Sequence, residues 1–210
     1  MGTFEEFTQQ YVESAAYHEA THEVICVVLK IPIREQGLHI DTRACGLALT
    51  FRRSAGDLKN DPIDIHEREQ SIILLNAGYI GQVRVFPDVP IEDSQDDRSL
   101  ADALLSEMYE PNSAAYQAAK YSLRDKAEQL VTQYWPVIEA LAKELLAKPW
   151  TDRVMLPPAS MGWSNDVTEK SMDAQEVQEI LTQFGLTAII RQDDAGSYAH
   201  PIKENKNDAT

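Results

Sequence analysis

Residues 3–29 read TFEEFTQQYVESAAYHEATHEVICVVL, and this stretch predicts one long helix. Thr3 followed three residues later by Glu6 forms a capping box, which is typical of a helix N-terminus. From there apolar side chains recur at steps of three and four, as they do on one face of a helix. That stripe consists of Phe7, Tyr11, Ala15, His18, His22, Ile25 and Leu29. Two histidines therefore occupy the buried face, where aliphatic side chains would be expected.

The two histidines belong to the segment His18-Glu19-Ala20-Thr21-His22, an HExxH pattern. Side chains four residues apart lie on the same side of a helix, so both imidazoles can bind one zinc ion. Glu19 is adjacent and can act as the general base for a water at that metal. Two imidazoles without partners on an apolar face would be costly, which favours a metal site over two ordinary core or surface histidines. The pattern indicates a zinc-dependent hydrolase.

A zinc hydrolase needs a third protein ligand and keeps the fourth position open for water. The sequence offers several candidates, among them His39, His66, His200 and many acidic residues. Composition and spacing alone do not choose among them.

The rest of the chain predicts a mainly helical fold with one small β-hairpin. Alternating apolar residues at 38–40 and 47–51, separated by a polar turn, predict the hairpin. Helical patterns follow at about 63–85, 94–109, 113–147 and 173–184. In the first of these, Ile65, Ile72, Ala77 and Ile80 are expected to face inward. The long pattern at 113–147 is expected to bend at Pro136.

The domain organisation follows from length and composition. A chain of 210 residues with 43% hydrophobic content is long enough for one compact domain. We expect this domain at residues 1–185, with a loop at 148–172, and a flexible polar tail at 186–210.

Charge and cysteine content bear on partners and location. The formal net charge of −15 provides no basic patch for nucleic acid or anionic lipid. No apolar stretch approaches the roughly 20 residues of a membrane span, and the N-terminus lacks the pattern of a secretory signal. Cys26 and Cys45 form no Cys-x-x-Cys pair, which is typical of a reducing compartment. We therefore expect a cytoplasmic protein that binds neither nucleic acid nor membrane.

The HExxH helix and the segments after it resemble the peptidase domain of FtsH-type zinc peptidases, whose helix reads His-Glu-Ala-Gly-His. The family's hairpin is similar to residues 37–40 (GLHI) and 46–50 (GLALT). Its Leu-Ala-Gly-Arg-Ala-Ala-Glu helix is similar to 74–82 (LLNAGYIGQ), and its Ala-Ser-Asn-Asp segment is similar to 93–97 (DSQDD). Its C-terminal helices are similar to 134–146 and 171–177. The segments occur in the family's order and cover about residues 15–185. The resemblance implies a zincin-like helical peptidase domain.

The resemblance also implies that the segment at 93–97 supplies the third zinc ligand. In the family, apolar residues follow this aspartate at steps of three, four, seven, eight and eleven. From Asp97 these steps reach Leu100, Ala101, Leu104, Leu105 and Met108, whereas from Asp96 they reach Ser99, Leu100, Ala103, Leu104 and Glu107. The resemblance combined with this spacing implies Asp97.

The chain also differs from the family. It contains no Gly-x-x-x-x-Gly-Lys-Ser/Thr phosphate loop and no transmembrane segment, and Thr21, Tyr79 and Gln82 replace the family's Gly, Arg and Glu. We expect an ATP-independent zinc metallopeptidase that cleaves unfolded or extended polypeptides. Its expected partners, besides the substrate, are a separate unfoldase or further copies of the same chain. The alternative is a catalytically silent metal-binding helical module that acts as an adaptor.

The expected substrate-binding residues lie in the second strand of the hairpin. An extended peptide can add to the open edge of a strand through backbone hydrogen bonds. We assign this role to Leu47, Leu49 and Phe51.

Overall fold

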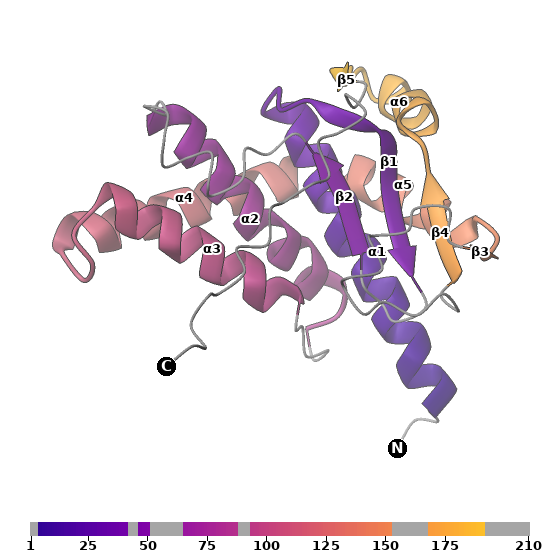
Figure 1. The fold of residues 1–210 in the computed structure, drawn as a ribbon, viewed down its shortest axis with the longest axis horizontal. Coiled ribbons are helices and arrows are strands. Elements are labelled where there is room, and N and C mark those ends of the chain that lie inside the picture. Colours follow the sequence, from indigo (N-terminus) through magenta and orange to yellow (C-terminus); the bar gives the residue numbers. More distant parts are fainter. Residues whose placement is uncertain (1–3, 42–45, 51–64, 88–92, 153–167, 192–210) are drawn as a thin grey trace, which may run out of the picture.

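The computed structural model describes residues 4–41, 46–50, 65–87, 93–152 and 168–191. Within these ranges the fold is mainly helical with a small sheet, as the sequence predicts (Figure 1). The helices are α1 (Phe4–Val28), α2 (Ile65–Val85), α3 (Asp93–Met108), α4 (Ala114–Gln133), α5 (Trp135–Ala147) and α6 (Ala174–Gln183). The strands are β1 (Ile33–Asp41), β2 (Gly46–Thr50), β3 (Thr151–Asp152), β4 (Thr168–Met172) and β5 (Ile190–Arg191). None of the helices in the described ranges combines the length and apolar character of a membrane span.

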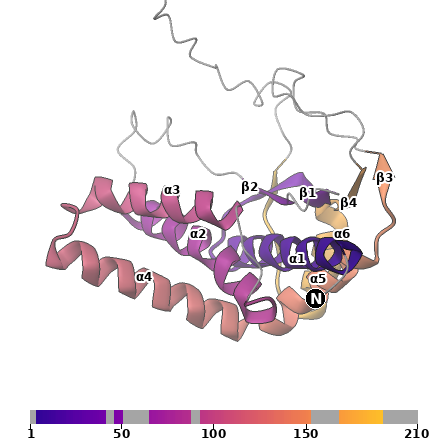
Figure 2. The same cartoon turned by 90° about the horizontal axis from the view of Figure 1, so that it is seen from below.

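Helix α1 lies at the centre of the molecule. It contacts α2, α5, β1 and β2, and every residue from Ser14 to Val27 is buried. The predicted apolar stripe is therefore only one part of the buried surface of α1, which is covered on every side along this segment. The small side chains of Ala15, Ala16 and Ala20 allow the neighbouring elements to approach closely. Figure 2 shows α1 between the sheet and α5. The HExxH segment therefore lies in the most enclosed part of the fold.

Two helix predictions differ from the structure. Ile65, expected to face inward, is 63% exposed at the first residue of α2, whereas Ile72 and Ala77 are buried as expected. The predicted helix at 113–147 is two helices, because α4 ends at Gln133 and α5 begins at Trp135. Pro136 lies in the first turn of α5 and has no N–H to continue the hydrogen bonds of α4. One helix therefore ends and a second begins at this point, instead of a single bent helix.

The sheet is larger than the predicted hairpin. Strands β1 and β2 pair antiparallel, with His39 opposite Leu47, which confirms the hairpin. The sheet then continues in the order β2-β1-β4-β3, while β5 pairs with β1 in parallel. Strands β3 and β4 lie at the two ends of the segment 148–172 that was expected to be a loop. The polar sequence Thr-Glu-Lys-Ser-Met of β4 lacks the apolar alternation by which a strand is recognised.

The segment after α6 also belongs to this domain as far as residue 191. The backbone N–H of Ile33 donates to the carbonyl of Ile189 at 2.9 Å, and Leu186 and Ala188 pack against the core. Residues 186–191, assigned above to the tail, therefore close one end of the sheet. The remainder of the expected tail lies outside the described residues.

Helices α1 and α2 meet at two glycines. A Cβ atom at Gly81 would lie 2.9 Å from Cβ of Thr21 and closer still to its hydroxyl, which itself donates to the carbonyl of Tyr17 at 2.6 Å. A Cβ atom at Gly78 would lie 2.8 Å from Nε2 of His18. The absence of side chains at these two positions sets the separation of the helices.

Gly81→Ala is expected to destabilise the fold by about 1–3 kcal/mol, because the added methyl group overlaps Thr21 in a packed interface. Chemical unfolding followed by circular dichroism measures the effect. Thr21→Gly serves as the control, since it removes the overlapping side chain at a cost of roughly 1 kcal/mol in helix propensity. Adding Gly81→Ala to Thr21→Gly should then cost little. Equal losses in both backgrounds would show that the contact does not limit packing.

Candidate metal centre

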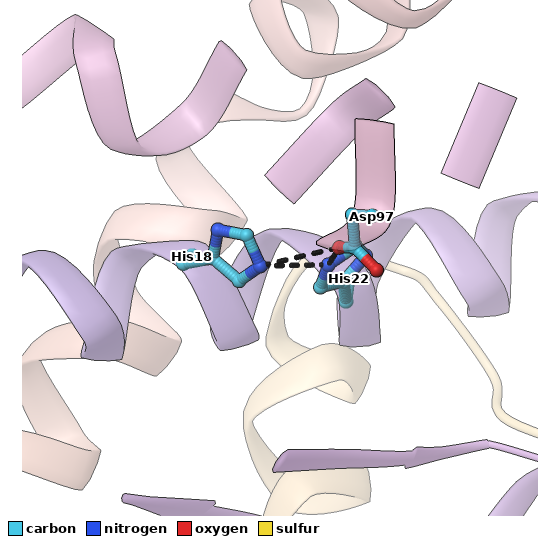
Figure 3. Close-up of side chains that lie close together, drawn as sticks. All are labelled: His18, His22 and Asp97. Atoms are coloured by element: carbon cyan, nitrogen blue, oxygen red, sulfur yellow. Dashed lines mark hydrogen bonds and ion pairs between the residues drawn. The ribbon is translucent and has the colours of Figure 1, made fainter. Parts of the chain in front are cut away.

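Three side chains from two helices converge on one point (Figure 3). Nε2 of His22 lies 3.0 Å from Nε2 of His18 and 2.7 Å from Oδ2 of Asp97, and the third separation, from His18 Nε2 to Asp97 Oδ2, is 3.4 Å. The histidines come from adjacent turns of α1, and Asp97 comes from near the start of α3. The structure thus brings together the three residues expected to be ligands.

These separations fit a tetrahedral metal ion. Zinc bonds of about 2.0–2.1 Å place neighbouring ligand atoms about 3.3 Å apart. Two of the separations, 3.0 and 3.4 Å, are close to this value, and the third, 2.7 Å, is shorter. The side chains of His18 and His22 are only 5% and 2% exposed, while that of Asp97 is 18% exposed. Two imidazoles and one carboxylate form a donor set typical of catalytic zinc, and Asp97 is the most exposed of the three residues. The residues present therefore fit a zinc ion.

Gly78 on α2 makes room for this cluster. Its missing side chain would point at the two imidazoles, at 2.8 Å from Cε1 and Nε2 of His18 and closer to Nε2 of His22. Any larger residue would push the rings away from their common point. The close contact of α1 with α2 thus also fixes the positions of the two histidines.

A buried chain of hydrogen bonds orients His18. Nε2 of Gln82 donates to the hydroxyl of Ser14, which turns the amide oxygen of Gln82 toward Nδ1 of His18, 3.1 Å away. Because an amide oxygen can only accept, Nδ1 carries the proton and Nε2 presents its lone pair to the cluster. This is the tautomer that a metal at Nε2 requires.

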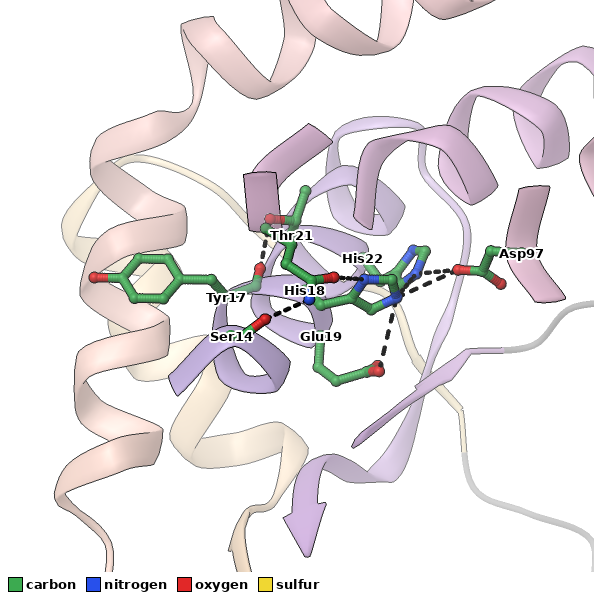
Figure 4. Close-up of polar contacts among 8 residues, drawn as sticks. Ser14, Tyr17, His18, Glu19, Thr21, His22 and Asp97 are labelled. Carbon is green, nitrogen blue, oxygen red and sulfur yellow. Dashed lines mark hydrogen bonds and ion pairs between the residues drawn. The ribbon is translucent and has the colours of Figure 1, made fainter. Parts of the chain in front are cut away.

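Glu19 lies beside the cluster. Figure 4 shows it next to the two imidazoles, with Oε1 4.0 Å from Nε2 of His18. Burial by itself lowers the pKa of His18, but the carboxylates of Asp97 and Glu19 outweigh this effect and raise the pKa overall. These two carboxylates favour a positive charge at His18, and they would favour a cation held by its imidazole in the same way.

Glu23 is a residue of this region that the sequence analysis missed. It follows His22 directly, is fully buried, and has no hydrogen-bond partner for either carboxyl oxygen among the described residues. Burial, and to a smaller extent the charge of Glu19, raise the pKa of Glu23 to about 8. The available signal was a charged residue directly after HExxH, on a helix whose following residues are all apolar.

The other candidate ligands lie elsewhere. Asp96 is exposed. His39 lies on β1 with Nδ1 3.7 Å from Oε1 of Glu169, and neither belongs to the cluster. His66 is in the first turn of α2, and His200 lies outside the described residues. Only Asp97 among the proposed third ligands reaches the two histidines within the described part of the chain.

Two of the three expected substrate-binding residues lie in a strand that the structure describes. Leu47 and Leu49 belong to β2, which occupies one end of the strand order and has β1 as its only strand neighbour in the described sheet. Phe51 lies outside the described residues. Strand β2 also contacts α1, the helix that carries the histidines.

Comparisons of the sequence with protein-family models and with curated proteins find no match. The resemblance to FtsH-type peptidases therefore rests on the order of motifs and stays a prediction.

Asp97→Ala is expected to abolish stoichiometric zinc binding, because it removes one of three ligands. The loss of affinity should exceed the roughly 10–100-fold typical of removing a residue that only orients a ligand. Zinc content after dialysis against a buffered zinc concentration measures this effect. Asp96→Ala, one residue away and exposed, is the matched control and should retain zinc. Full occupancy in Asp97→Ala, or loss in His39→Ala, would contradict the ligand set.

Proposed function

We propose that this protein is a zinc metallopeptidase that cleaves unfolded or extended polypeptides without ATP. The observation that carries the proposal is the convergence of His18, His22 and Asp97 with the carboxylate of Glu19 beside them. A structural zinc site has no need of a carboxylate next to its ligands, whereas a hydrolase requires a base at that position.

The number of ligands also supports a catalytic site. Structural zinc sites are usually closed by four protein ligands, and catalytic sites use three. The described residues provide three ligand atoms within 4.8 Å of one another. Asp97 is the most exposed of the three residues, and we propose that a substrate approaches the cluster from its side.

The roles of the chain's own residues follow from this geometry. Zinc, when bound, lowers the pKa of a water and polarises the carbonyl of the scissile bond. His18 and His22 hold the ion through their Nε2 atoms, and Gln82 keeps His18 in the required tautomer. Glu19 accepts the proton of the attacking water and returns it to the leaving amine. Its Oε1 lies 4.0 Å from Nε2 of His18, on which the ion would be held.

Glu19→Gln is expected to reduce peptide hydrolysis by about a hundredfold or more while zinc content and fold are retained. The amide has the same shape but cannot accept the proton. Hydrolysis of a quenched fluorescent peptide, with and without a chelator, measures the effect, and bound zinc is determined in the same sample. An unchanged rate would remove Glu19 from the mechanism. Wild-type protein that binds zinc but cleaves no peptide would favour the adaptor alternative.

The form of the substrate follows from the position of β2. A strand at the end of a sheet presents backbone groups to which an extended peptide can add. Strand β2 contacts α1, the helix that carries the two histidines, and we propose that a peptide added to this strand reaches the metal centre. Binding of this kind requires the substrate to be extended, but it does not require a particular sequence.

An unfolded protein such as reduced casein should be cleaved much faster than a tightly folded domain, and ATP should change neither rate. Leu49→Pro should lower peptide cleavage, since proline removes a backbone N–H from β2. Leu49→Ala retains that N–H and is the control. Equal cleavage of folded and unfolded substrates, or unchanged cleavage by a folded Leu49→Pro variant, would contradict the edge-strand model.

A further inference from the structure

Three buried polar side chains form a line that leads away from the metal centre. Ser14 and His18 lie one turn apart on the same side of α1 (Figure 4), and Gln82 of α2 reaches both of them. Nε2 of Gln82 donates to the hydroxyl of Ser14, while Oε1 of Gln82 lies 3.1 Å from Nδ1 of His18. All three residues are buried, so solvent gives little compensation for a partner that any of them loses.

The amide group of Gln82 has two ends that are nearly equal in size and opposite in hydrogen bonding. The oxygen only accepts, and the NH2 group only donates, so shape alone does not decide which end faces His18. If the amide were reversed, its NH2 group would donate to Nδ1 of His18, and the proton of the neutral ring would then be on Nε2. A nitrogen that carries a proton cannot bind a metal. The orientation of Gln82 therefore decides whether His18 can be a ligand.

The reversed orientation has partners of its own. A proton on Nε2 of His18 would face Oδ2 of Asp97, 3.4 Å away, which can accept it. The NH2 group of Gln82 would in turn have the unprotonated Nδ1 of His18 as its acceptor. The observed orientation has to be favoured from the other end of the amide, where the hydroxyl of Ser14 accepts from the NH2 group. Without that hydroxyl the NH2 group would be a buried donor without an acceptor, and reversal would relieve this cost.

We propose that Ser14 is a positioning residue of the metal centre, because its hydroxyl holds the amide of Gln82 in the orientation that leaves Nε2 of His18 free to bind zinc. Ser14 acts through two other side chains. A carboxylate at position 82 would not need this help, since both of its oxygens accept and neither places a donor on His18. The proposal rests on the zinc centre of the proposed peptidase, and its test does not depend on peptide cleavage.

Two substitutions, made singly and together, test the proposal through zinc affinity. Ser14→Ala should weaken zinc binding by about tenfold or more, within the range for residues that orient a metal ligand. In the Gln82→Glu background the same Ser14→Ala change should weaken it by less than about threefold. Competition with a chromophoric chelator measures the affinities. Equal losses in the two backgrounds overturn the proposal, because a hydroxyl that served only packing would be missed equally in both. Wild-type affinity in Ser14→Ala also overturns it.

The position of the ring proton can be measured directly in zinc-free protein. Nitrogen chemical shifts of the neutral His18 ring distinguish a proton on Nδ1 from one on Nε2. The proton should be on Nδ1 in wild type and should move toward Nε2 in Ser14→Ala. It should be on Nδ1 again when Ser14→Ala is combined with Gln82→Glu. A proton on Nε2 in wild type, or no movement in Ser14→Ala, overturns the proposal.

Ser71→Ala is the matched control. It also removes a serine hydroxyl, one that donates to the carbonyl of Glu67 within α2 at 2.9 Å, and it should change neither zinc affinity nor the ring proton of His18. The outcomes separate this inference from the proposed function. Wild-type protein that binds zinc but cleaves no peptide contradicts the peptidase, while the two measurements above still decide the role of Ser14. Cleavage that requires zinc, together with equal losses in both backgrounds, overturns the role of Ser14 alone. Absence of zinc binding by wild-type protein overturns both.

Discussion

The structure depends on the burial of polar groups within one central helix. Residues 14–27 of α1 are covered on all sides, yet they include two imidazoles and two carboxylates. Such groups are tolerated in an interior only when other charges, hydrogen bonds or a metal compensate them. Asp97 from α3 and Gln82 from α2 provide this compensation at His18 and His22. The arrangement of α2 and α3 around α1 is thus also the arrangement that assembles the metal centre.

Close approach of α1 and α2 makes this compensation possible. Gln82 can reach His18 only because Gly78 and Gly81 let the two backbones come together. At this contact the branched side chain is on α1 and the glycine is on α2, so Thr21 is accommodated because Gly81 has no side chain.

Some features could be predicted from the sequence, and others depend on contacts that periodicity does not encode. Helical spacing and the HExxH pattern predicted α1, and the family's spacing indicated Asp97, because both express local geometry. Strand β4 was missed because its side chains are mostly polar, and it is held by pairing with β1. Ile65 was placed inward because a helical stripe does not show where the neighbouring helices end. Glu23 went unnoticed since its burial on every side is a tertiary property of α1.

The polar groups of α1 therefore fall into two kinds. His18 and His22 have partners that fix their orientation, so their burial is explained by the folded chain and the cation that it can hold. Glu23 has no such partner among the described residues, and replacing it by an apolar residue would be expected to stabilise the fold. Residues kept at a cost to stability are commonly those that function requires. Glu19 lies one turn away on the same helix, and its charge adds to burial in raising the pKa of Glu23, so the interior around α1 favours the neutral form of this carboxyl group.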